Sequence, residues 1–309
     1  MNFRSVPSLL LTTVIFSALS WAATERGVMV REAVLYLAPD TNSAKLANVE
    51  RGREVVVLEK SGNWAHVFAG LSQRRDVTGW MLDKGIVRAA TPNGDQIIYG
   101  AAADAEAEAS RRHGRRGAAD DALRLYSRVA EYFPQSPLAA EAAYRAADIR
   151  WQLERNEVMS RPSAKHRDPE MRGEINEDLM RTVMKKYPRT KWADLAAFHL
   201  IDNRLCGEWQ GESKCPEKEA EAYEKYAAEH PQSPVVADAL YDAAWRRAAL
   251  IEIYKTENAA GKSADARNRA LALAQRISSQ YPQTDWASRA RALAYMVEQN
   301  VAVYGNSVE

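Results

Sequence analysis

The 309-residue sequence predicts a multidomain protein in which a small all-β domain precedes an all-α helical solenoid. The first indication is a run of β-branched residues and glycine-containing turns that shows no helical period. The second is a helix-corner pattern that occurs four times in the rest of the chain. In chain order we expect a signal peptide (1–22), the β domain (27–88), a linker (89–95), the helical repeats (96–300) and a tail (301–309).

The first residues have the features of a secretory signal peptide. The basic Arg4 precedes an apolar run from Leu9 to Leu19, and the small residues Ser20 and Ala22 follow. This segment is too short to remain as a membrane span, so we expect cleavage near Ala22 and no transmembrane segment afterwards. No cysteine lies near this site to carry a lipid anchor. The expected location is therefore the periplasm, or outside the cell.

The charge of the exported chain is balanced. Removal of residues 1–22 takes away Arg4, so the 42 Lys and Arg become 41, against 41 Asp and Glu. This balance gives no general reason to expect nucleic acid or an anionic membrane as a partner. The local exception is the basic stretch "RRHGRR" at 111–116. We expect a solvated turn there, and a contact with phosphate or lipid A is the alternative.

The β domain is predicted from stretches such as "REVVVLEKSGNWAHVFAG" and "VTGWMLDKGIVR". The run 27–88 resembles a bacterial SH3-like domain, with Gly52, Trp64, Gly79 and Trp80 where that family has them. The resemblance implies a small barrel that holds peptidoglycan stems or tethers an enzyme to the wall. Trp64 and Trp80 are therefore candidate partner-binding residues. The interpretation we favour is plainer, that both fill a core that is marginal in so small a domain.

A short polar stretch, "RAATPNGD" at 88–95, follows the β domain. It reads as a linker and predicts that the β domain and the helical array are separate units.

The helical array is predicted from a corner built on Pro134, Pro188, Pro231 and Pro282. The second residue after each proline is a candidate helix N-cap: Ser136, Thr190, Ser233 and Thr284. The eighth is always alanine: Ala142, Ala196, Ala239 and Ala290. The fifth residue before each proline is apolar or aromatic: Val129, Val183, Tyr226 and Ile277. A helix stop, a cap and a small contact residue recurring together indicate stacked helical hairpins that share one core.

This array resembles the tetratricopeptide repeats. The stretch "ADDALRLYSRVAEYFP" carries their small–aromatic–small–proline spacing as Ala122, Tyr126, Val129 and Pro134. The nearest resemblance is to periplasmic modules of the BamD-type outer-membrane assembly lipoproteins, and it implies protein–protein interaction. The successive prolines are 54, 43 and 51 residues apart (134 to 188, 188 to 231, 231 to 282), whereas a tetratricopeptide repeat has about 34.

The surplus residues are predicted to form insertions at 160–174, 206–219 and 255–267. Because they follow equivalent helices, we expect them to project from one edge of the solenoid. That edge is a candidate binding surface, and solvated loops without a ligand are the alternative.

The second insertion contains both cysteines of the chain, Cys206 and Cys215. In an exported protein this pair predicts an intramolecular disulfide, because the loop offers no further ligands for zinc. The bond would hold Trp209 near the tip of the loop. Two roles are open for this tryptophan. It either folds back onto the helical hairpin, which we favour, or serves as an aromatic anchor for a partner.

No enzymatic signature occurs in the sequence. The five histidines are scattered and lack metal-ligand spacing, and no nucleophile-elbow, P-loop or dinucleotide-binding motif is present. We therefore predict no catalytic residues, no metal site and no cofactor. The predicted function is a non-enzymatic periplasmic adaptor or scaffold of the cell envelope. Its expected partners are one or more envelope proteins, with peptidoglycan as a further candidate. The alternatives are a structural subunit of an outer-membrane assembly or division complex, and an accessory protein for a wall hydrolase acting in trans.

Overall fold

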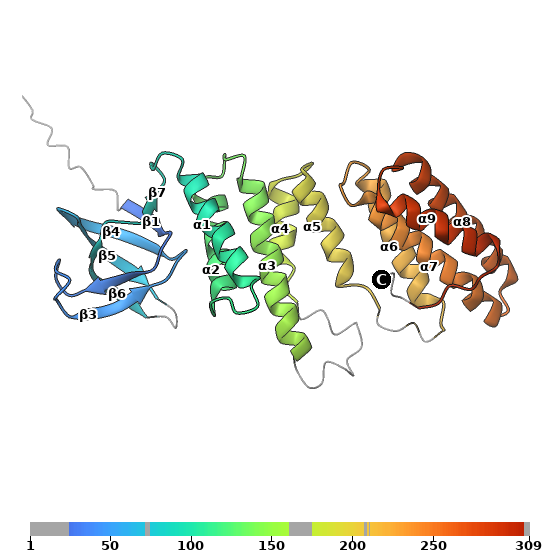
Figure 1. Ribbon diagram of the computed structural model, residues 1–309, viewed down its shortest axis with the longest axis horizontal. Coiled ribbons are helices and arrows are strands. Elements are labelled where there is room, and N and C mark those ends of the chain that lie inside the picture. The colour runs from blue at the N-terminus through green and yellow to red at the C-terminus, as the bar shows by residue number, and fades with distance from the viewer. Residues whose placement is uncertain (1–24, 72–74, 161–174, 207–208, 210, 306–309) are drawn as a thin grey trace, which may run out of the picture.

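A computed structural model describes residues 25–71, 75–160, 175–206, 209 and 211–305. It consists of a β domain followed by helices that lie across the long axis of the molecule and are stacked one after another along it (Figure 1). The predicted signal peptide and most of the first predicted insertion, 161–174, lie outside the described residues.

The β domain is a seven-stranded antiparallel sheet in the order β3-β2-β6-β5-β4-β1-β7. Its strands are β1 (Glu25–Met29), β2 (Ala33–Tyr36), β3 (Lys45–Val49), β4 (Glu54–Ser61), β5 (Trp64–Gly70), β6 (Asp76–Leu82) and β7 (Ile86–Arg88). No pairing among the described residues joins the edge strands β3 and β7. The all-β prediction is thus confirmed, whereas closure of the sheet into a barrel is not.

One face of this sheet carries the core of the β domain. Along β5 and β6, side chains alternate between the two faces, and the inward residues Ala65, Val67 and Met81 are fully buried. They form one cluster with residues of the neighbouring strands such as Leu35 and Val55. Small and branched side chains therefore fill the interior of the domain.

The helical domain begins with α1 immediately after the sheet. Its helices are α1 (Gly94–Ala109), α2 (Ala118–Tyr132), α3 (Ala139–Ser160), α4 (Asp178–Lys186), α5 (Lys191–Asp202), α6 (Lys214–Glu229), α7 (Val236–Thr256), α8 (Ala260–Gln280) and α9 (Asp285–Glu298). Each helix packs on its neighbours in sequence, and α7 also packs on α9. This confirms an all-α part after the β part. Of the described helices, none combines the length and hydropathy that a bilayer crossing requires.

The four predicted corners share one backbone geometry. The residue before each proline ends a helix with φ between −128° and −124° and ψ between 46° and 59°. These residues are Phe133, Tyr187, His230 and Tyr281. The backbone N–H of each donates to the carbonyl four residues earlier, which is the predicted apolar site of the preceding helix. The four corner alanines are all fully buried. The repeat found in the sequence is therefore a structural repeat.

The predicted N-caps divide into two kinds. The hydroxyl of Thr190 accepts the N–H of Ala193 at 3.2 Å and caps α5. Thr284 occupies the cap position of α9, but its hydroxyl accepts no N–H of that helix and donates to the Tyr281 carbonyl at 2.8 Å. Ser136 and Ser233 were predicted as caps, but α3 and α7 begin three residues after them. Both serines precede a proline, and the chain first makes a tight turn closed by an i to i+3 hydrogen bond.

Where the structure describes the predicted insertions, they do not form projecting loops. Residues 255–267 mostly lengthen α7 and α8, with only a short turn between these helices. In the second insertion, α6 already begins at Lys214 rather than near Lys218, so Cys215 lies inside the helix. A shared binding edge built from the three insertions is therefore not found among the described residues.

Candidate functional site

The outward face of the β sheet carries a cluster of aromatic side chains, Tyr36, Trp64, His66 and Trp80, which we call the aromatic face. Residues in a strand alternate between the two faces of the sheet. Since Ala65 and Val67 point into the core, Trp64 and His66 point outward from β5. All four aromatic side chains are half-buried.

The register of the strands brings these rings together. Tyr36 of β2 pairs with Trp80 of β6, which pairs in turn with His66 of β5. The rings of His66 and Trp80 stack with centroids 4.8 Å apart, and the Tyr36 and Trp64 rings meet edge to face at 5.7 Å. Such aromatic pairs contribute about 0.5–1.5 kcal/mol beyond their buried area. Both ring contacts therefore stabilise this arrangement of the aromatic face.

The aromatic face continues into two further apolar residues. Phe68 is 39% exposed and Leu82 is 38% exposed, and they lie on β5 and β6 in the same alternation. Large side chains of this kind in partial contact with water mark a surface that can bind a partner by stacking and apolar contact. The imidazole of His66 adds a hydrogen-bonding group.

These positions differ from the favoured sequence interpretation of Trp64 and Trp80. We expected both tryptophans to fill the core, but neither belongs to the core cluster of the β domain. The interior is filled instead by Ala65 and Met81, the direct neighbours of the two tryptophans. The sequence interpretation did not include Tyr36 and His66. The alternation "WAHVF" at 64–68 was the signal that could have placed His66 beside Trp64.

The β domain and the first helices share a second buried cluster, the junction core. Val28 and Val87 of the sheet pack in it with Ile98 of α1 and with Leu125 and Tyr126 of α2. The Tyr126 hydroxyl donates to Glu106 at 2.7 Å. Burial is the largest cause that raises the pKa of Tyr126, and this hydrogen bond is the second. The sequence predicted two separate units joined by a linker. The structure instead joins them through a continuous apolar core, because the described turn after β7 is short.

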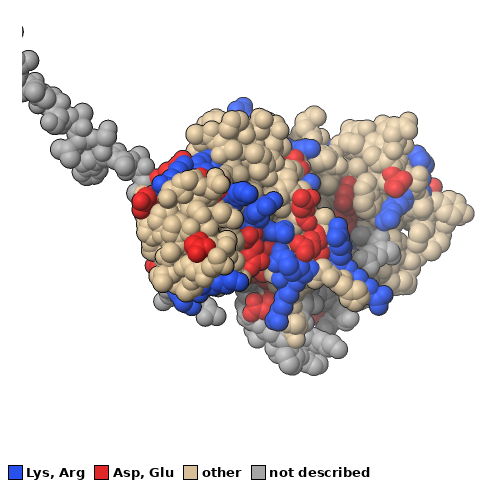
Figure 2. Space-filling model, turned by 60° about the vertical axis from the view of Figure 1, so that its left-hand side comes forward, with Lys and Arg blue, Asp and Glu red and all other residues tan. Residues whose placement is uncertain are grey.

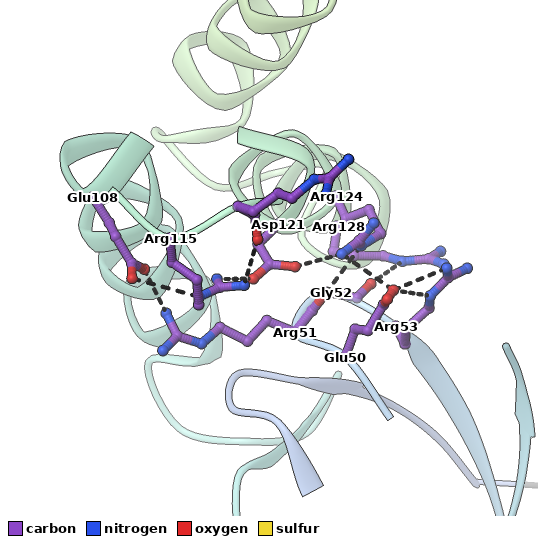
Figure 3. A network of polar contacts seen from close by, with 10 residues as sticks. Glu50, Arg51, Gly52, Arg53, Glu108, Arg115, Asp121, Arg124 and Arg128 are labelled. Atoms are coloured by element: carbon purple, nitrogen blue, oxygen red, sulfur yellow. Dashed lines mark hydrogen bonds and ion pairs between the residues drawn. The ribbon is translucent and has the colours of Figure 1, made fainter. Parts of the chain in front are cut away.

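A polar network links the β3–β4 turn to α1 and α2 (Figure 3). The Arg124 guanidinium donates to the Arg51 carbonyl at 3.1 Å, and Arg51 forms an ion pair with Glu108 of α1 at 3.8 Å. The Tyr132 hydroxyl donates to Glu54 at 2.7 Å. Burial is the largest cause that raises the pKa of Tyr132, and this hydrogen bond is the second. These contacts fix the β3–β4 turn against α2.

The basic stretch 111–116 supplies Arg115 to this network. Its guanidinium hydrogen-bonds to Asp121 and lies 3.4 Å from Glu108, and the bond to Asp121 is the leading cause that raises its pKa. The adjoining cavity of about 410 Å³ is lined by five arginines and four carboxylates. Figure 2 shows basic and acidic side chains interleaved in a band beside the β domain. Because this lining is nearly neutral and Arg115 is engaged, it does not favour a phosphate site.

The predicted disulfide is present in the helical domain. The Sγ atoms of Cys206 and Cys215 are 2.06 Å apart, and both residues pack against the largest buried cluster of the array. Trp209 between them is only 7% exposed and belongs to that cluster. The favoured interpretation, that Trp209 folds back onto the helices, agrees with this position. A buried ring is not available as an exposed anchor for a partner.

A buried carboxylate, Glu219 of α6, organises this loop. One of its oxygens accepts the backbone N–H of Cys206 at 2.7 Å and the indole N–H of Trp209 at 3.4 Å. The other accepts from Arg246 of α7 at 2.7 Å. Arg246 also pairs with Asp242 at 2.9 Å. Burial is the leading cause that raises the pKa of Asp242. The sequence interpretation missed this charged centre, because nothing local marks Glu219 as buried.

We expect the disulfide to stabilise the folded chain by roughly 2–3 kcal/mol, since it closes a short loop in the unfolded state. A variant with both Cys206→Ser and Cys215→Ser should show this loss in urea unfolding. Thiol titration of the denatured, unreduced chain should find no free thiol. Two reactive thiols per chain, or equal stability of wild type and variant under oxidising conditions, would contradict the prediction.

The described residues contain no group of three or more His, Cys, Asp or Glu side chains that could hold a metal ion. What they define is a β domain joined to a helical domain through the junction core, with an aromatic surface on the outer face of the sheet. The chain matches no model of a known protein family, and no curated protein is significantly similar to it.

Proposed function

We propose that the protein is a non-enzymatic adaptor of the cell envelope, located in the periplasm. In this proposal the β domain is an SH3-like module that binds peptidoglycan through the aromatic face. The helical domain is a tetratricopeptide-like solenoid that binds an envelope protein. The aromatic face is the observation that carries the proposal.

Two features support the choice of modules. The antiparallel strand order is compatible with a small SH3-like fold. The four corners with one geometry are what a solenoid of helical hairpins requires, because each hairpin must meet its neighbour in the same way. A separate feature supports the location, because the disulfide fits an oxidising compartment such as the periplasm.

The aromatic face supports a binding role for the β domain. The core of the sheet is complete without Trp64 and Trp80, so these rings are not needed to fill the interior. Tryptophan and tyrosine are enriched at binding sites because they offer a large rigid surface at low entropic cost. Peptidoglycan presents sugar rings and short peptide stems, which can stack against such a surface.

The junction core supports an adaptor in preference to two loosely tethered modules. Because Val28 and Val87 are buried with residues of α1 and α2, the aromatic face keeps a fixed position relative to the array. Two ligands bound at these sites would be held at a fixed distance and orientation. That property suits a protein that places a partner at the wall.

We expect Trp80→Ala in the full chain to weaken co-sedimentation with purified peptidoglycan sacculi about tenfold, equivalent to ~1.4 kcal/mol. The reason is loss of the ring that stacks with His66 and pairs with Tyr36. The measurement is the bound fraction against sacculus concentration. Tyr295→Ala is the matched control, since this tyrosine is 63% exposed on α9, within the helical domain. Equal binding by wild type and Trp80→Ala would count against the aromatic face, and no binding by wild type would refute the peptidoglycan proposal.

A further inference from the structure

The chain reverses direction after α9 through a defined turn. Asn300 has a left-handed backbone with φ of 57°. The N–H of Val301 donates to the Met296 carbonyl at 2.8 Å, and that of Asn300 to the Val297 carbonyl at 3.3 Å. This is the pattern of a helix C-terminus closed by a left-handed residue, a role in which asparagine is second to glycine. Arg267 of α8 donates to the Asn300 side chain at 2.8 Å and holds the turn on the array.

The tail that follows, residues 301–305, lies on α7 in a non-helical conformation. Val303 is 3% exposed and belongs to the largest buried cluster of the array. The indole N–H of Trp245 on α7 donates to the Gly305 carbonyl at 3.2 Å. By contrast, Val301 is 50% exposed and Tyr304 is 75% exposed. One inserted side chain, solvent-facing neighbours and a backbone carbonyl bonded to an indole are features of a bound extended peptide.

An open cavity lies next to the residue from which the tail starts. A cavity of about 560 Å³ adjoins Asn300 and is lined by the C-terminal part of α7 and the start of α8. Its lining includes Ile251, Lys255, Ser263 and Ala264. The tail therefore occupies the surface beside Trp245, and the open cavity begins at Asn300, the residue before the tail. Figure 1 shows the chain after α9 turning back toward α7.

We propose that this groove on α7 is a peptide-binding site whose resident ligand is the chain's own tail. The partner that fits is an extended segment with a small aliphatic side chain in the place of Val303 and solvent-facing residues in the places of Val301 and Tyr304. Such a segment displaces the tail and can extend into the open cavity beside Asn300. The proposal rests on the protein-binding role of the helical domain and names the surface and the kind of ligand for it.

A peptide-binding experiment on the full chain tests this site. The probe is a fluorescein-labelled peptide with the sequence of residues 299–309, QNVAVYGNSVE. Val303→Asp in the full chain places a charge in the apolar pocket and should release the tail, so this variant should bind the probe at least tenfold more tightly than wild type does. Tyr304→Ala is the matched control, because its exposed side chain makes no buried contact, and it should behave like wild type. A probe that carries the same valine-to-aspartate change should not bind.

A second variant tests the site even if Val303→Asp does not fold. Asn300→Val leaves the buried Val303 unchanged but disfavours the left-handed turn, since β-branched residues avoid positive φ. It should raise probe affinity to an intermediate value. Failure of both folded variants to bind the probe, or equal probe affinity in wild type and Val303→Asp, would overturn the proposal. A wild-type dimer in light scattering that becomes monomeric in Val303→Asp would also overturn it, in favour of tail exchange between copies. Sacculus binding by the β domain is measured separately, so either result can fail alone.

Discussion

Glu219→Ala is expected to lower the free energy of unfolding by about 3 kcal/mol, because it leaves a buried arginine without one of its two carboxylate partners. Arg246 is 3% exposed and is held by Glu219 and by Asp242. Loss of Glu219 also removes the acceptor for the Cys206 and Trp209 N–H groups. A donor left without an acceptor costs up to roughly 1–3 kcal/mol when it is buried, as the Trp209 N–H is, and less when it is part-buried, as the Cys206 N–H is. Because Arg246 keeps its pair with Asp242, we expect the total loss in free energy of unfolding to lie near the lower end of the range for a broken buried ion pair.

Urea unfolding followed by far-UV circular dichroism measures this change. Glu221→Ala is the matched control, since Glu221 lies on the same helix but is exposed; its effect should stay within about 0.5 kcal/mol. Glu219→Gln keeps the shape of the side chain but not its charge. Its free energy of unfolding should lie between those of wild type and Glu219→Ala. A Glu219→Ala variant as stable as Glu221→Ala would show that the Arg246 centre contributes little.

Gly52→Ala is expected to destabilise the junction by about 3 kcal/mol, from backbone strain and overpacking together. Gly52 has a φ of 74°, and a Cβ atom there would lie 2.5 Å from the Cβ of Arg124 and 3.0 Å from the Leu125 backbone nitrogen. These atoms belong to the body of α2 and cannot rotate away. The β3–β4 turn would have to move off α2, which disturbs the polar network around Arg124.

Gly62→Ala separates the two causes. Gly62 also has a positive φ, of 57°, but no atom lies within 4 Å of the added Cβ. Its expected cost is the backbone strain alone, about 1 kcal/mol. Thermal unfolding measures both variants, and limited proteolysis of the turn after β7 reports whether the domains separate. Similar melting temperatures for the two variants would mean that the contact between the β3–β4 turn and α2 is not important for stability.

Features encoded within a few residues could be predicted from the sequence. The four corners depend on a proline that stops one helix, a Ser or Thr two residues after it and an alanine six residues after that, so the sequence alone indicates them. The Cys206–Cys215 pair was predicted because the two cysteines are only nine residues apart in a chain that is expected to be exported, and the structure joins them. The β character of the first domain followed from its alternating strands. In each case the information is local, and the physical preference acts over fewer than about fifteen residues.

The tertiary structure alone decided which face of each element meets the core. Alternation in a strand defines two faces but not which one is buried, and the space inside this small sheet accepts Ala65 and Met81 while Trp64 and Trp80 lie outside. The buried position of Trp209 depends on Glu219 and Arg246, which come from two different helices. The same holds for the junction core and for Val303 of the tail, whose neighbours are distant in sequence. Burial is a property of the assembled elements, and so these sites became visible only when the elements were packed together.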